Sequence, residues 1–232
     1  YSVEGGKTAV SKGGEAKVEV TNSYTRDLGK LELEKVIAGA KGDADLTDAQ
    51  REQMVFTVTG PDNFTRTVKY SEFTDGKYML EDLPTGEYTV VEEGADFFEN
   101  YSLNVSYGVT GGKTTVIKGG TAGVTVTNTY SQDVGSLEVK KTFADNALTE
   151  EQKAAVEFTV TGPNNYSASK TYAEFVNGSW KLENLPVGEY TVTESNADVA
   201  GYTRRTSYSV EGGKTAVSKG GEAKVEVTNS YT

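Results

Sequence analysis

Three strand-like segments carry a polar residue at a position where the alternating pattern predicts a buried apolar one. Side chains two apart on a β-strand share a face. In LELEKV, Lys35 therefore lies on the face of the leucines, and in EYTVVE, Glu92 lies on the face of the tyrosine and the first valine. In VTVTNTY, Asn128 lies on the face of both valines. The equivalent residues further along the chain are Lys141, Glu194 and Asn229. Each core is therefore predicted to contain a lysine, a glutamate and an asparagine.

These three polar groups must satisfy one another, because leaving them on an apolar face costs several kcal/mol. One solution is an ion pair between the lysine and the glutamate, with the asparagine hydrogen-bonded to both. The other solution is covalent, because burial lowers the pKa of lysine and raises that of glutamate, so that a proton passes between them. The neutral amine then attacks the asparagine side-chain carbonyl, the glutamate shuttles protons, and ammonia leaves. The residues thus predict either an ion pair or an isopeptide bond.

The surrounding elements are predicted to be almost entirely β. Short runs with period-two alternation are separated by turn signals such as GPDN, TDGK, LPTGE and GGK, which gives about seven strands per domain. One helical signal occurs in each domain, where Thr47 or Thr149 can cap a short helix and Gln50 or Gln152 can close a capping box. This pattern predicts an all-β fold of two tandem immunoglobulin-like β-sandwich domains, each with a short helical turn.

Internal repeats define the domain organisation. Residues 1–25 recur without change as residues 208–232, and a looser copy occupies residues 107–131. We therefore expect a first domain at residues 28–133 and a second at residues 134–232. Residues 1–27 are then the C-terminal strands of a preceding, identical copy of the second domain. Such copying favours a tandem array with a structural role over an enzyme.

Composition excludes several classes of chemistry. The 232 residues include 23 Lys+Arg and 34 Asp+Glu, a net charge of −11, with no cysteine and no histidine. A thiolate nucleophile, a disulfide, an imidazole base and a Cys/His zinc site are therefore excluded, and the acidic balance disfavours nucleic acid and anionic lipid as partners. No cofactor is expected. No apolar run approaches the roughly 20 residues that cross a bilayer, and the chain opens without a signal region, so an excerpt of a longer protein is expected.

Three motifs occur in both domains: an opening L-x-[LV]-x-K, the run LPTGEYTVVE or LPVGEYTVTE, and a closing V-T-N-x-Y. Together they resemble the B-type repeat domains of Gram-positive collagen adhesins (Cna B-type domains) and the related pilin domains. In that family the lysine of the first strand and the asparagine of the last strand form a spontaneous isopeptide bond, assisted by the glutamate. The resemblance implies the crosslinks Lys35–Asn128 and Lys141–Asn229, with Glu92 and Glu194 as the catalytic residues. The loops that follow the two glutamates depart from the family pattern.

The resemblance also implies a function, that of a stalk or spacer repeat of a Gram-positive cell-surface adhesin, located outside the cell and anchored to its wall. The crosslink would join the first strand to the last, so that tension bypasses the fold. Closing a loop of nearly 100 residues removes on the order of 4–5 kcal/mol of unfolded-state entropy. The only expected reaction is this self-directed one, so the protein is not expected to be an enzyme. Expected partners are neighbouring repeats of the same chain, and host matrix through a head domain elsewhere.

The main alternative is a ligand-binding adhesin module that recognises a host matrix protein or a glycan. Phe97, Phe98 and Tyr101 could form its binding site, or could cover the end of the sandwich. A polymerising pilin is a further alternative, because LeuProThrGly at residues 83–86 is similar to a sortase sorting signal. This run lacks the spacer residue of that signal, and it is interpreted as a turn before a core strand.

Two other features are not expected to form a site. One is a group of acidic residues, which is not expected to bind a metal ion, and the other is the repeated N-terminal segment, which is not expected to exchange covalently. A calcium site is not expected, because the spacing of the acidic residues lacks the glycine and terminal glutamate of an EF-hand loop; these residues are Asp43, Asp45 and Asp48. Residues 1–25 are expected to add to a sheet edge of a neighbouring molecule without a covalent bond. Exchange with residues 208–232 would instead make Asn22 the acceptor for Lys141, but the chain's own copy is tethered nearby.

Overall fold

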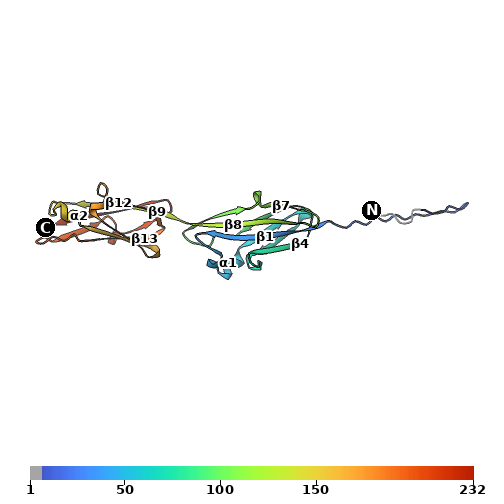
Figure 1. The fold of residues 1–232 in the computed structure, drawn as a ribbon, viewed down its shortest axis with the longest axis horizontal. Helices are drawn as coiled ribbons and strands as arrows, with labels where there is room; N and C mark the ends of the chain where they lie inside the picture. Colours follow the sequence, from blue (N-terminus) through green and yellow to red (C-terminus); the bar gives the residue numbers. More distant parts are fainter. Residues whose placement is uncertain (1–6) are drawn as a thin grey trace. The chain divides into compact units, whose positions relative to one another are not determined.

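The computed structural model describes residues 7–232, and each of its two domains contains two four-stranded sheets (Figure 1). In the first domain the sheet orders are β4-β1-β8-β6 and β3-β2-β5-β7. The strands are β1 (Leu28–Gly39), β2 (Val55–Thr59), β3 (Thr65–Lys69), β4 (Lys77–Pro84), β5 (Gly86–Glu93), β6 (Tyr101–Tyr107), β7 (Lys113–Val116) and β8 (Thr121–Gln132). The helices are α1 (Asp48–Gln53) and the single turns η1 (Asp43–Asp45), η2 (Pro61–Asn63), η3 (Tyr70–Glu72) and η4 (Thr110–Gly112).

The second domain has the same arrangement, with sheet orders β12-β9-β16-β14 and β11-β10-β13-β15. Its strands are β9 (Val134–Phe143), β10 (Glu157–Gly162), β11 (Tyr166–Thr171), β12 (Ser179–Pro186), β13 (Gly188–Ser195), β14 (Arg204–Tyr208), β15 (Lys214–Val217) and β16 (Glu222–Tyr231). Its helices are α2 (Glu150–Ala154), η5 (Pro163–Asn165), η6 (Tyr172–Glu174) and η7 (Glu211–Gly213). The predicted all-β fold of two β-sandwich domains is confirmed. Each domain has eight strands rather than about seven, because β7 and β15 are separate four-residue strands.

The first and last strands of each domain are neighbours in one sheet. In the second domain β16 runs parallel to β9, with Val225 opposite Val139 and Val227 opposite Lys141. The remaining neighbours of these two strands are antiparallel: β12 pairs with β9, and β14 pairs with β16. The first and the last strand of the domain therefore lie side by side at the centre of one sheet.

The core forms as the period-two pattern predicts. Along β1 the inward residues Leu31 and Leu33 are fully buried, and the intervening residues face outward. The opposite sheet contributes Phe56, Val58 and further residues, so the two inward faces make one apolar layer in each sandwich. The corresponding core of the second domain includes Leu137, Val139, Phe158, Val160, Trp180, Tyr190, Val192, Val225 and Val227.

The predicted local signals are confirmed. Thr47 caps α1 by accepting a hydrogen bond from the Gln50 backbone, and Gln50 accepts one from the Thr47 backbone, which completes the capping box. Thr149 and Gln152 do the same for α2. The run at residues 83–86 spans the end of β4 and the start of β5, so it is a turn before a core strand.

Residues 7–27 contain neither helix nor strand, and their side chains are exposed. Residues 1–6 of the same N-terminal segment lie outside the described residues. The position that a second copy of this sequence could take in the second domain is occupied by the chain's own β15 and β16. Within residues 7–232, no helix has the length and apolar character needed to cross a membrane.

Candidate functional site: a buried lysine, glutamate and asparagine

The second domain brings its three predicted residues together between the two sheets. Lys141 comes from β9 and Asn229 from the neighbouring strand β16, while Glu194 comes from β13 of the opposite sheet. Glu194 is opposite Phe158 in the register of β10 and β13, and the side chain of Phe158 is fully buried. The Lys141 side chain is 0% exposed and that of Glu194 is 1% exposed. The prediction that these polar residues face the core is therefore confirmed.

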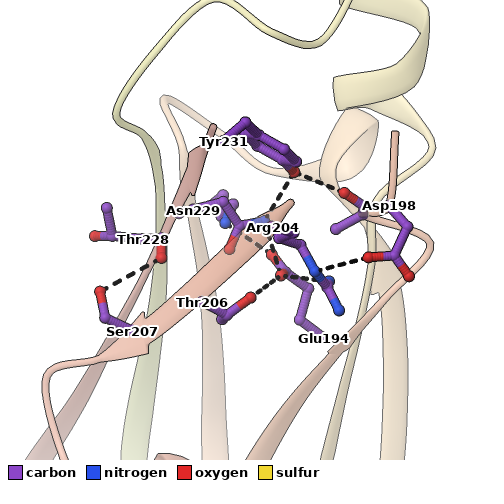
Figure 2. Close-up of polar contacts among 10 residues, drawn as sticks. Glu194, Asp198, Arg204, Thr206, Ser207, Thr228, Asn229 and Tyr231 are labelled. Atoms are coloured by element: carbon purple, nitrogen blue, oxygen red, sulfur yellow. Dashed lines mark hydrogen bonds and ion pairs between the residues drawn. The ribbon is translucent and has the colours of Figure 1, made fainter. Parts of the chain in front are cut away.

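The three side chains make short polar contacts. Lys141 Nζ lies 2.7 Å from Glu194 Oε1, and Asn229 Nδ2 donates a hydrogen bond of 2.8 Å to Glu194 Oε2. The glutamate thus contacts the lysine with one carboxylate oxygen and the asparagine with the other. Figure 2 shows Asn229 directed at Glu194, which lies on the opposite sheet.

These contacts do not satisfy every polar atom that is buried in the core. Lys141 Nζ is held by its ion pair with Glu194 Oε1, and among the described residues Asn229 Oδ1 has no hydrogen-bond partner. Burial lowers the pKa of Lys141 below its usual value, even though Glu194 acts to raise it. The buried amine therefore loses its proton more readily than an exposed lysine does, and a neutral amine is a nucleophile.

Aromatic residues surround the second site. Tyr231, two residues after Asn229, accepts a hydrogen bond from Asn229 Nδ2 and donates one of 2.7 Å to the Ala197 carbonyl. Lys141 Nζ lies 4.7 Å from the centre of the Phe143 ring and 6.0 Å from that of Phe158. These rings exclude water from the amine, which is the cause of its lowered pKa.

The first domain repeats the buried ion pair with Lys35 and Glu92 and places Asn128 at the position of Asn229. Lys35 Nζ lies 2.9 Å from Glu92 Oε1, and both side chains are 0% exposed. Asn128 on β8 is also fully buried, and in the described part of the chain its side-chain amide has no hydrogen-bond partner. Burial lowers the pKa of Lys35 to about 8, although Glu92 acts to raise it.

Further polar residues at the second site were not predicted from the sequence. Arg204 Nη1 and Thr206 Oγ1 on β14 donate hydrogen bonds of 3.3 and 3.4 Å to Glu194 Oε2. Arg204 also pairs through Nε with Asp198, at 3.0 Å. Both β14 residues share a face with the half-buried Tyr208, so the two-residue period contained the signal for them.

The aromatic residues of the alternative binding site are engaged in packing. The Phe98 ring meets the Tyr130 ring edge-on at 4.8 Å, and Phe98 also contacts Tyr101 at 6.2 Å. Lys41 Nζ lies 4.8 Å from the Tyr101 ring. Phe97, Phe98 and Tyr101 are half-buried rather than exposed. This arrangement favours the interpretation in which the aromatics cover the end of the sandwich.

The acidic residues near α1 are placed by local structure. Asp45 accepts a hydrogen bond of 2.7 Å from the Gly42 backbone, and Asp48 begins α1. Across the described ranges, no cluster of three or more acidic residues is placed to hold a metal ion.

Comparison with known proteins assigns a family. A family model described as "Domain of unknown function (DUF5979)" matches residues 31–131 and again residues 137–232. The chain belongs to this family. Both copies of the DUF5979 domain contain the full set of buried lysine, glutamate and asparagine. A search of the curated proteins finds no match to the chain.

Solved structures similar to this pair of DUF5979 domains come from Gram-positive surface proteins. The Bacillus anthracis TIE protein is 25% identical with a TM-score of 0.45, and the match covers 88% of this chain and 34% of that protein. A B repeat unit of the Staphylococcus aureus collagen-binding protein Cna is 21% identical, with a TM-score of 0.28 and coverage of 89% and 100%. The Streptococcus pyogenes major pilin is 15% identical, with a TM-score of 0.42 and coverage of 87% and 98%. These neighbours include the domains that the sequence motifs resemble.

Proposed function

We propose that this pair of DUF5979 domains is a stalk segment of a Gram-positive cell-surface protein, held together by one Lys–Asn isopeptide bond per domain. The observation that carries the proposal is the buried triad, which occurs twice and has its lysine on the first strand of a domain and its asparagine on the last. The rival interpretation is an ion pair with a hydrogen-bonded asparagine. The rival leaves the buried Asn229 Oδ1 without a hydrogen-bond donor among the described residues, which is costly in an apolar core.

In the proposed reaction, the lysine first loses its proton to the glutamate or to solvent. Its neutral Nζ then attacks Cγ of the asparagine, and a tetrahedral intermediate forms. After the attack Nζ carries one proton too many for an amide, and the glutamate takes this proton and delivers it to Nδ2. In the second domain Glu194 contacts both Lys141 and Asn229. The new bond joins Nζ to Cγ, the bond from Cγ to Nδ2 breaks, and the nitrogen leaves as ammonia. Each site reacts once, so the domains are substrates of their own chemistry and not enzymes that turn over.

The proposed bond supports a mechanical role. Residues 142–228 lie between Lys141 and Asn229 in the sequence, so a chain pulled from both ends would carry its tension through β9 and the crosslink. We place the domains at residues 28–133 and 134–232, as segments of an array that holds a binding head away from a wall-anchored base. Its partners are neighbouring repeats of the same chain. An amide crosslink, unlike a disulfide, also withstands reductants.

The proposal is tested by removing one glutamate. Replacing Glu92 by Ala is expected to leave Lys35 and Asn128 unlinked, because the proton carrier is lost, while the second domain remains linked. The unlinked first domain loses about 4–5 kcal/mol of stability through its open loop, and loss of the counter-ion of Lys35 adds to this destabilisation, so it melts at a lower temperature and is cleaved faster by proteases. Mass spectrometry of tryptic peptides, together with thermal melting, measures both effects. Glu194→Ala is the matched control, with the domains reversed.

Full crosslinking of the first domain in Glu92→Ala would show that Glu92 is not required for the reaction. Loss of both crosslinks in that variant would contradict the independence of the two sites.

A separate prediction concerns the repeated N-terminal segment. Its residue Asn22 has the sequence position of Asn229, and Val18, Val20 and Tyr24 are exposed. Strand exchange would create a branched peptide that joins Lys141 to Asn22. We expect this peptide in a small minority of molecules at most, because the tethered β16 reaches its position first. Peptide mapping of concentrated protein measures it, and a majority of Lys141–Asn22 linkage would contradict the prediction.

A further inference from the structure

Glu92 and Glu194 differ in the residues of the strand that follows each of them, which is β6 in the first domain and β14 in the second. The strand sequences YSLNVSY and YTRRTSY align without a gap, so that Leu103 of the first domain corresponds to Arg204, and Val105 corresponds to Thr206. The side chains of leucine and valine have no hydrogen-bond donor and no charge. The strand that follows the catalytic glutamate therefore supplies a cation in the second domain and an apolar residue in the first.

The cation contacts the reactive group directly. Arg204 Nη1 donates to Glu194 Oε2 at 3.3 Å, the same oxygen that accepts the hydrogen bond from Asn229. The Arg204 side chain is 25% exposed, and its Nε is held by Asp198. Figure 2 shows Arg204, Thr206 and Asn229 converging on Glu194. Arg204 is thus fixed at the edge of the core and not free in solvent.

We propose that Arg204 is a positioning residue that stabilises the Lys141–Glu194 ion pair, and that bond formation is consequently slower and more pH-dependent in the second domain than in the first. The inference rests on the proposed isopeptide chemistry, because it concerns the rate of that reaction. The covalent step itself is the same in both domains: Nζ joins Cγ, and ammonia leaves.

The effect of the cation follows from the proton balance of the attack. The amine must be neutral, and its proton can pass to Glu194 or to solvent. A positive charge beside the carboxylate favours the ion pair over the neutral pair, so transfer to Glu194 becomes less favourable. Release to solvent remains, and Arg204 assists this second route, because, besides burial, its charge also acts to lower the pKa of Lys141. The fraction of amine that has released its proton to solvent rises with pH, so this route is slow at low pH. In the first domain Leu103 adds no charge, and internal transfer from Lys35 to Glu92 stays available at lower pH.

The other polar and charged groups around the second site are two tyrosines and two aspartates. Burial raises the pKa of Tyr208 and of Tyr231, so both phenols stay neutral. Asp198 opposes the charge of Arg204, but its side chain is 85% exposed and therefore screened by water. Asp145 accepts a hydrogen bond from the Tyr231 backbone.

The test compares both domains in the same molecule. The full chain is recovered unfolded from inclusion bodies, diluted from denaturant into buffers between about pH 5.5 and about pH 7.5, below the lysine pKa, and quenched at intervals. The two branched tryptic peptides are then quantified against their unlinked forms. Trp180, the single tryptophan, is buried in the second domain and reports the folding of that domain separately.

In the wild-type chain, the Lys35–Asn128 peptide is expected to form about tenfold faster than the Lys141–Asn229 peptide near pH 6. Arg204→Leu should accelerate the second bond about tenfold and flatten its pH profile, and Leu103→Arg should slow the first. Arg204→Lys, which keeps the charge, should retain most of the wild-type pH dependence.

Three results would overturn the inference. The first is an unchanged rate and pH profile in Arg204→Leu. The second is an equal effect of Arg204→Leu and Arg204→Lys, which would show a packing role without a charge effect. The third is a change that follows the Trp180 signal, because the variant would then act on folding. Absence of branched peptides from both domains would instead refute the proposed function itself, so the two failures are distinguishable.

Discussion

The intact mass of the purified chain is expected to fall below the mass calculated from its sequence by two molecules of ammonia. One molecule leaves at each site, because an amine and a primary amide are converted into a secondary amide. Trypsin should then yield two branched peptides, one containing Lys35 and Asn128 and the other containing Lys141 and Asn229. Neither lysine should be cleaved, since its side chain no longer carries the charge that trypsin recognises.

Single substitutions provide the controls for the mass measurement. Asn128→Ala and Asn229→Ala should each show the loss of one ammonia molecule and retain the branched peptide of the other domain. Both variants keep the buried Lys–Glu ion pair, so each chain is expected to fold. A wild-type mass equal to the calculated value would refute the covalent interpretation and leave the ion pair as the solution to the buried charges.

The second large effect is expected in the extension of single molecules under force. With both bonds formed, the residues between each lysine and its asparagine cannot extend, and no unfolding step is expected from either domain. In Asn229→Ala the second domain is unlinked, and its unfolding should release a step of roughly 300 Å, at about 3.4 Å per extended residue. Force spectroscopy of the full chain, held at its two ends, measures the step directly.

The matched variant Asn128→Ala should give one step of similar size from the first domain, and the double variant should give two. A step of this size in the wild-type chain would show that the loop is not closed. Two steps in either single variant would show that the other domain had also failed to crosslink.

Much of the site follows from the sequence because strand alternation is a local rule. The inward position of Lys141 depends only on residues two and four positions before it, and Glu194 and Asn229 follow in the same way. The caps at Thr47 and Thr149 are equally local, because each involves a side chain and a backbone group three residues apart. Such features require no knowledge of the opposite sheet.

The contacts of Arg204 could not be obtained in this way. Alternation places Arg204 and Thr206 on one face of β14, but their partner Glu194 lies on β13 of the other sheet. Which inward side chains meet across a sandwich depends on the stagger of the two sheets and on the loop between β13 and β14. The separation of the last segment into β15 and β16, which belong to different sheets, depends likewise on the pairing of β15 with β13. These are tertiary properties, and a local pattern does not specify them.

The parallel pairing of β16 with β9 has a consequence that does not require the covalent bond. The chain enters the domain at the start of β9 and leaves it at the end of β16, and in a parallel pair these points lie at opposite ends of the ladder. Pulling on the termini therefore slides one strand along the other in shear, which loads all the hydrogen bonds of the ladder together instead of opening them one after another. A newly folded domain would thus already resist load while its crosslink is still forming.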